Sequence, residues 1–119
     1  MTGDIKIKIV RDRIDMGELK KMAKDGFGNL VKAVVDIKRG IMAIGGELHS
    51  DEEASLLEDG SRQVDLWGIN LYPELQLTEW IEFDSIINIR PSQGNFSREV
   101  ESVHVRDRIK DIVNKLVRR

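Results

Sequence analysis

The sequence contains no cysteine, only two prolines and few aromatic residues, which make up 5% of the chain. The absence of cysteine excludes disulfide scaffolds, thiol nucleophiles and cysteine-based zinc sites. No apolar run approaches the roughly 18 residues that a membrane-spanning helix needs. The opening segment MTGDIKIKIV lacks the basic-then-apolar pattern of a secretion signal. We therefore expect a cytoplasmic protein with no membrane contact.

What the sequence does contain is typical of one compact domain. Its 119 residues, 40% hydrophobic and 34% charged, fit a single domain over residues 1–119. The charge is uneven, because residues 47–59 hold six acidic residues and no Lys or Arg, whereas residues 100–119 hold six basic and three acidic residues. These segments either form separate solvated surfaces or attract each other, within one chain or between two copies.

Hydrophobic periodicity predicts five strands and three helices. Asp15 and Ser50 are predicted N-caps, since each is followed three residues later by a glutamate. Alternating or continuous apolar patterns predict strands at 4–10, 31–37, 41–48, 64–72 and 79–89, and the helices are predicted to run from Asp15 to Gly26, from Ser50 to Asp59 and from Val103 onward. The order β-α-β-β-α-β-β-α predicts an α+β domain with a mostly antiparallel or mixed five-stranded sheet and helices packed on one face.

The two later strands carry an unusual set of polar residues on their even positions. Side chains alternate across a strand, so a hairpin of 64–72 with 79–89 would place these residues on one face. They are Asn70, Tyr72, Trp80, Glu82, Asp84, Asn88 and Arg90. Asparagine disfavours strands, which favours a binding role for this face. The alternative is structural, with Asn in a bulge or Glu82 paired to Arg90.

The connection 90–98 continues this face toward the last helix. It contains Arg90 and Arg98, two serines, Gly94 and Asn95. Such a segment can aim backbone N–H groups and guanidinium groups at an anion, although it matches no phosphate-loop consensus. In the ligand hypothesis, Arg90 and Arg98 hold an anionic group, and a concave pocket is required at residues 90–98. The residues expected to orient the ligand or pack on it are Asn70, Asn88 and Asn95, with Trp80 or Tyr72. A turn rich in ordinary turn residues is the alternative.

Other chemistry has weaker support in the sequence. Glu47, His49 and Asp51 alternate on an extended segment and form a minor metal-binding alternative, with His104 as a further ligand. No standard nucleophile setting is present, so the sequence leaves open whether the protein is an enzyme. Glu82 and Asp84 are the carboxylate pair that could act as acid and base. No cofactor and no nucleic acid are expected, since the net charge is −2.

Several strings in the second half resemble a small family of archaeal and bacterial proteins known only as a domain of unknown function. The most distinctive are D-L-W-G-I-N-L-Y-P at 65–73 and N-I-R-P-S-Q-G-N at 88–95. The resemblance extends over about residues 5–117 and implies one domain and a prokaryotic cytoplasmic protein. It implies no activity, cofactor or site residue.

Two functions follow from these observations. The first is binding of a small polar or anionic ligand on the polar face and the 90–98 connection. The second is a homo-oligomeric or partner-binding module without catalytic activity, in which a homodimer buries a sheet face and the oppositely charged segments meet.

Overall fold

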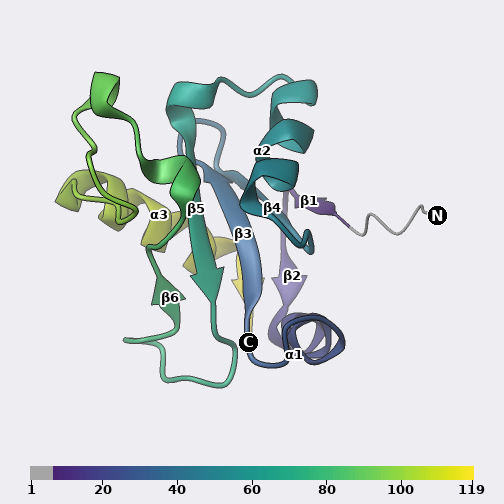
Figure 1. The fold of residues 1–119 in the computed structure, drawn as a ribbon. Helices are drawn as coiled ribbons and strands as arrows, with labels where there is room; N and C mark the ends of the chain where they lie inside the picture. The colour runs from purple at the N-terminus through teal and green to yellow at the C-terminus, as the bar shows by residue number, and fades with distance from the viewer. Residues whose placement is uncertain (1–6) are drawn as a thin grey trace.

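A central antiparallel sheet organises the chain, for which a computed structural model describes residues 7–119 (Figure 1). The sheet has five strands in the order β1-β4-β3-β5-β6. These are β1 (Lys8–Val10), β3 (Val31–Asp36), β4 (Ile41–Ile44), β5 (Leu66–Leu71) and β6 (Ile81–Glu82). The α+β class and the mostly antiparallel five-stranded sheet are therefore confirmed. Positions 4–6 of the predicted first strand lie outside the described residues.

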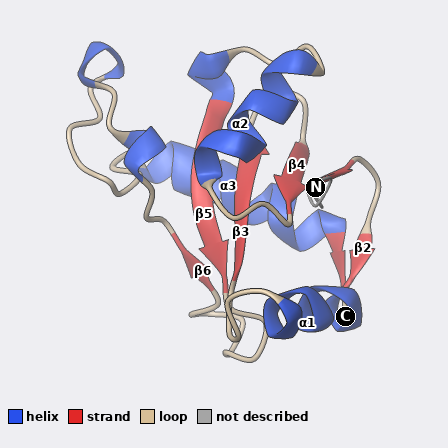
Figure 2. Cartoon of the chain, turned by 45° about the vertical axis from the view of Figure 1, so that its right-hand side comes forward, coloured by secondary structure: helices blue, strands red, loops and turns tan. Residues whose placement is uncertain are grey.

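The α-helices of residues 7–119 cover both faces of the sheet, so the prediction that they pack on one face is wrong. α1 (Met16–Asp25) and α3 (Val103–Leu116) pack on one face, and α2 (His49–Glu58) covers the other (Figure 2). Along β3, Ala33 and Val35 belong to the cluster with α1 and α3, whereas Val34 packs with Leu56 of α2. The reason is that β3, β4 and β5 are apolar on both sides, as in strands buried between two layers. None of the helices in this part of the chain has the length and apolar character for a membrane crossing.

The predicted order of the main elements is confirmed, but the last predicted strand is far too long. Of residues 79–89 only Ile81–Glu82 form a strand, followed by an isolated bridge between Asp84 and Glu99 and by two 3-10 turns, η2 (Ile86–Asn88) and η3 (Pro91–Gln93). The chain therefore leaves the sheet edge soon after Glu82. A short parallel pair of β2 (Ile14–Asp15) with β7 (Val117–Arg118), which periodicity does not indicate, joins two distant segments.

Helix boundaries follow the sequence signals at α1 and depart from them at α2. α1 follows Asp15 and ends before Gly26, as predicted. α2 begins at His49, with Leu48 as its N-cap, so the predicted capping box of Ser50 and Glu53 does not form. The Glu53 carboxylate instead lies 3.5 Å from the guanidinium of Arg90. Glu53 therefore contacts Arg90, which is distant in sequence, and does not cap its own helix.

The two oppositely charged segments do not meet within the fold. α2 and α3 lie on opposite faces of the sheet, and no ion pair found in residues 7–119 joins 47–59 to 100–119. Asp59 at the end of α2 pairs with Arg11 at 2.7 Å and with Arg39 at 2.8 Å. These two ion pairs lower the pKa of Asp59 to about 2.

α2 also carries a carboxyl group into the protein interior. Glu52 is fully buried, and its Oε2 accepts a hydrogen bond from the Gly46 N–H at 2.9 Å. Its Oε1 has no hydrogen-bond partner among the residues that the structure describes. Burial raises the pKa of Glu52 well above its ordinary value, because an ionised carboxylate loses its hydration there. Folding therefore favours the neutral form of this group.

We expect Glu52→Gln to stabilise the protein increasingly as the pH rises above 4.5, the ordinary pKa of glutamate. Above that pH the unfolded chain loses a proton that the folded chain keeps, so the wild-type free energy of unfolding falls until Glu52 also ionises in the fold. Urea denaturation over a pH series measures the difference. Glu58→Gln, on the exposed side of the same helix, is the control and should follow the wild type. Equal pH slopes for Glu52→Gln and the wild type would contradict this account.

Candidate functional site

The structure divides the residues predicted on the polar face into two groups. One group stays at the β5–β6 edge, and we call it the edge cluster. The other group is buried, and three of its four members hold the chain that follows β6. The edge cluster consists of Asn70, Tyr72, Glu82, Asp84 and Arg98, and the buried group of Trp80, Asn88, Arg90 and Asn95.

Asn88 joins the buried group to the sheet. Its Oδ1 accepts a hydrogen bond from the Gly68 N–H at 2.8 Å, and its Nδ2 donates to the Gly68 carbonyl at 3.0 Å. The same Nδ2 donates to the Arg98 carbonyl. The side-chain amide of Asn88 thus takes the place of the strand residue that would otherwise pair with Gly68. Its role in this structure is to fix the chain.

Arg90 is almost entirely used by the protein itself. Its side chain is 8% exposed, and its guanidinium donates to the carbonyl oxygens of Ile87, Gln63 and Leu66. It also lies against the Trp67 ring, with 4.9 Å between the guanidinium carbon and the ring centroid. These contacts leave it little capacity to hold an anion.

Asn95 closes the loop that Arg90 begins. Backbone hydrogen bonds run both ways between Arg90 and Asn95, and Gly94 between them has a φ of 78°, which favours glycine. The Asn95 side chain donates to the carbonyls of Asn88, Ser97 and Glu99, and its Oδ1 accepts the Glu101 N–H. We call Asn88, Arg90 and Asn95 the loop frame, because their side chains replace regular secondary structure over residues 88–101.

Trp80 lies in the main hydrophobic core rather than on a polar face. Its side chain is fully buried among residues of the sheet, α1 and α3. The chain turns between Trp80 and Glu82, so the even-numbered positions of this segment do not share one side. Trp80 is therefore not placed to stack on a ligand.

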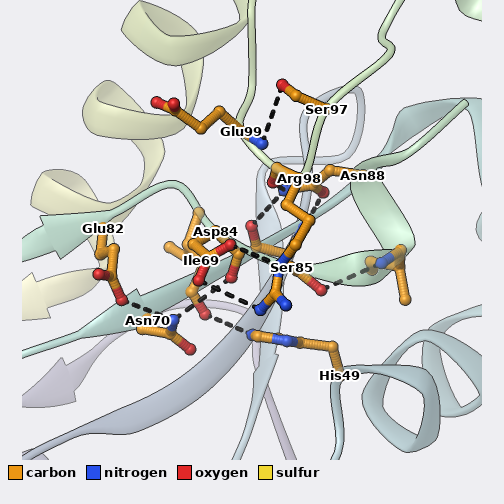
Figure 3. A network of polar contacts seen from close by, with 12 residues as sticks. His49, Ile69, Asn70, Glu82, Asp84, Ser85, Asn88, Ser97, Arg98 and Glu99 are labelled. Atoms are coloured by element: carbon orange, nitrogen blue, oxygen red, sulfur yellow. Dashed lines mark hydrogen bonds and ion pairs between the residues drawn. The ribbon is translucent and has the colours of Figure 1, made fainter.

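The edge cluster forms a hydrogen-bonded network at the end of β5, of which Figure 3 shows Asn70, Glu82, Asp84 and Arg98. Glu82 Oε1 accepts hydrogen bonds from Asn70 Nδ2 at 2.8 Å and from the Tyr72 hydroxyl at 2.9 Å. Asp84 forms a two-pronged pair with Arg98, at 2.8 and 3.2 Å. The charges of Arg98 and Asp84 therefore offset each other, and the network presents a carboxylate, Glu82, at the surface.

His49 borders the edge cluster, although sequence reasoning considered it only as a metal ligand. Its Nε2 donates to the Ile69 carbonyl at 2.7 Å, and its ring lies near Asn70 (Figure 3). Burial lowers the pKa of His49, which favours the neutral ring. Glu47 and Asp51 are exposed and form no cluster with it, and no group of three or more potential metal ligands occurs in residues 7–119.

A hollow of about 490 Å³ lies between the loop frame, β5 and the first turn of α3. This volume is within the range of about 300–1,000 Å³ that is usual for small-molecule sites. A second hollow of about 450 Å³ lies between α1 and Pro73–Glu74, away from the predicted site residues. The first hollow is lined by Ile37, Val64, Trp67, Gln93, Gly94, Asn95, Glu101, Ser102 and Val105.

The walls of the first hollow combine apolar side chains, Trp67 among them, with one ionisable group, Glu101. Trp67 is 5% exposed, and its indole N–H has no hydrogen-bond partner among the described residues. Glu101 accepts hydrogen bonds from the N–H groups of Phe96 and Ser97 and from the Ser97 hydroxyl. The sequence itself does not single out either residue, because Trp67 has the pattern of a core residue and Glu101 that of a solvent-exposed residue before a helix. The ligand hypothesis requires a pocket at residues 90–98, and Gln93, Gly94 and Asn95 line this hollow.

A family model described as "Protein of unknown function (DUF5674)" matches residues 8–116, from the start of β1 to the end of α3. The chain belongs to this family. The resemblance that the sequence strings indicated is confirmed, and DUF5674 membership brings no activity or site residue with it. Searches of curated proteins and of solved structures found no protein that matches this DUF5674 chain.

We expect Arg90→Ala and Arg98→Ala to differ strongly in stability. Removing Arg90 takes a guanidinium donor from the carbonyls of Ile87, Gln63 and Leu66 and from the Glu53 carboxylate, which should cost about 3 kcal/mol in the free energy of unfolding. Arg98 is half exposed and pairs with Asp84 at the surface, so its removal should cost less than about 1 kcal/mol. Urea denaturation of the two variants measures both values. Equal losses would show that Arg90 is not a structural element.

Proposed function

We propose that this protein binds a small polar ligand in the hollow beside the loop frame. The observation that carries the proposal is the hollow itself, which has the volume of a small-molecule site and is lined by apolar side chains, Trp67 among them, together with polar groups of Gln93, Asn95, Glu101 and Ser102.

The loop frame supports the proposal because it makes one wall of the hollow rigid before any ligand arrives. Gln93, Gly94 and Asn95 line the hollow, and Asn95 is held by four side-chain hydrogen bonds. A site that is already ordered loses little conformational entropy on binding. Binding residues commonly lie on loops that a rigid scaffold positions.

The chemistry favours a polar ligand over an anionic one. Arg90, the expected anion holder, is occupied by carbonyl groups, and Arg98 is paired with Asp84. The edge cluster remains a secondary polar surface in this proposal. The proposal concerns binding and assigns no reaction. The cysteine-free sequence is compatible with a reducing cytoplasm, where we place the protein.

A second candidate function is self-association through the two charged faces. The acidic surface of α2 also exposes Leu48 and Leu57, and the basic surface of α3 exposes Val103. Because these surfaces lie on opposite sides of the sheet, a contact between them joins two copies head to tail. Such a contact does not by itself give the closed two-fold interface of an ordinary homodimer.

We expect any such association to depend on salt. Light scattering at low ionic strength should then show a mass above that of one chain, falling to the single chain in about 0.5 M salt as charges are screened. Glu58→Lys on α2 should weaken the association at low salt. A single-chain mass at every protein concentration and low salt would contradict the self-association function.

For the ligand site, we expect Val64→Phe to abolish ligand-induced stabilisation. Val64 lines the hollow and is partly exposed, so the larger ring fills the space without disturbing the core. A ligand at about ten times its Kd should raise the wild-type melting temperature by about 5 °C or more. Differential scanning fluorimetry with small aromatic amines, alcohols and carboxylates measures this shift.

Val103→Phe is the matched control, since Val103 is exposed and does not line the hollow. It should respond to ligands like the wild type. A panel that stabilises no form of the protein, or that stabilises Val64→Phe as well as the wild type, would contradict the proposed site.

A further inference from the structure

The charge in the hollow comes from one side chain. Of the residues that line it, only Glu101 is ionisable, and it is acidic. We infer that the ligand of the hollow is an organic cation, an ammonium or amidinium group on an apolar body, with Glu101 as its counter-ion. This inference rests on the proposed function and specifies the chemical class of the ligand.

Glu101 is held as a fixed, ionised acceptor. Three donors converge on its Oε2, the N–H groups of Phe96 at 2.9 Å and Ser97 at 2.8 Å and the Ser97 hydroxyl at 2.8 Å. The Ser97 hydroxyl and these N–H groups lower the pKa of Glu101. None of the hydrogen bonds found for the described residues uses Oε1, which is therefore free to accept from a ligand.

The rest of the wall fits the apolar body of such a ligand. Ile37, Val64 and Val105 line the hollow together with the Trp67 ring. The guanidinium of Arg90 already lies 4.9 Å from the centre of that ring. A second cation over the indole would meet this positive charge, so the charged group of the ligand belongs at Glu101 and its apolar part at Trp67.

The neighbouring cations do not provide an anion site within the hollow. Arg106 donates to the Val100 carbonyl and pairs with Glu99 at 3.0 Å. Arg108 donates its Nε–H to the Ile37 carbonyl at 2.9 Å and reaches the rim there, but it does not line the hollow. A carboxylate ligand would face Glu101 without a lining cation to balance it.

The two tryptophans make this inference directly measurable. Trp67 lines the hollow and Trp80 lies in the core, so a proton–nitrogen NMR spectrum contains one indole signal from each. Three probes of similar shape differ only in their polar end: phenethylamine, 2-phenylethanol and 3-phenylpropionate. Titration of each into the wild-type protein should shift the Trp67 indole signal and leave that of Trp80 nearly unchanged.

We expect phenethylamine to bind about fivefold or more tightly than 2-phenylethanol, the effect of one ion pair at contact distance in water, and 3-phenylpropionate to bind least. Glu101→Gln should remove the advantage of the amine and leave the alcohol nearly unchanged. Glu99→Gln is the control: its carboxylate pairs with Arg106 outside the hollow, and it should keep the advantage.

The outcomes separate the two proposals. If no probe shifts the Trp67 signal, the hollow is not a binding site and the proposed function fails. If the alcohol or the carboxylate binds as tightly as the amine, the site stands and the cationic class of the ligand is wrong. The wild-type comparison decides this even if Glu101→Gln fails to fold, because it needs no variant.

Discussion

The close approach of two chain segments at Gly68 is the constraint on which the second half of this structure depends. A Cβ atom on residue 68 would lie 2.6 Å from the Cβ of Ser85 and 3.1 Å from a side-chain carbon of Ile87. Only glycine leaves room for η2 to rest on β5. With that space available, Asn88 reaches both backbone groups of Gly68 and satisfies them as a neighbouring strand would.

From this contact the polar residues of 88–101 acquire their roles. Once η2 is fixed against β5, Arg90 reaches the carbonyls at the start of η1 (Gln63–Asp65) and at the start of β5, and the Asn95 side chain donates to the Asn88 carbonyl and closes the loop. Burying a guanidinium and two amides is tolerable only because each has its partners. This loop and the first turn of α3 both contribute residues to the lining of the hollow.

The sequence predicts the α+β class and the order of the main elements, because these depend on local periodicity and turn chemistry. It does not predict that β6 ends at Glu82. Beyond that point the side-chain amide of Asn88, and not a strand backbone, bonds to Gly68, and the alternation of polar and apolar residues does not distinguish the two. It also assigns Arg90 to a ligand, because arginine is seldom buried. The continuous apolar runs of β3 and β4 do indicate that helices cover both faces of the sheet. The positions of Trp67 and Glu101 relative to each other depend on tertiary contacts that one sequence does not display.

The loop frame has a consequence for how the protein fluctuates. Loops without regular secondary structure ordinarily open in local motions that cost little free energy, and their amides then exchange with solvent. Here the Arg90 and Asn95 amides bond to each other's carbonyls, and the side chains of Asn88 and Arg90 bond to Gly68 and Leu66 of β5. We therefore expect the loop to open together with β5, as part of one cooperative unit, rather than in the low-cost local motions of an ordinary loop.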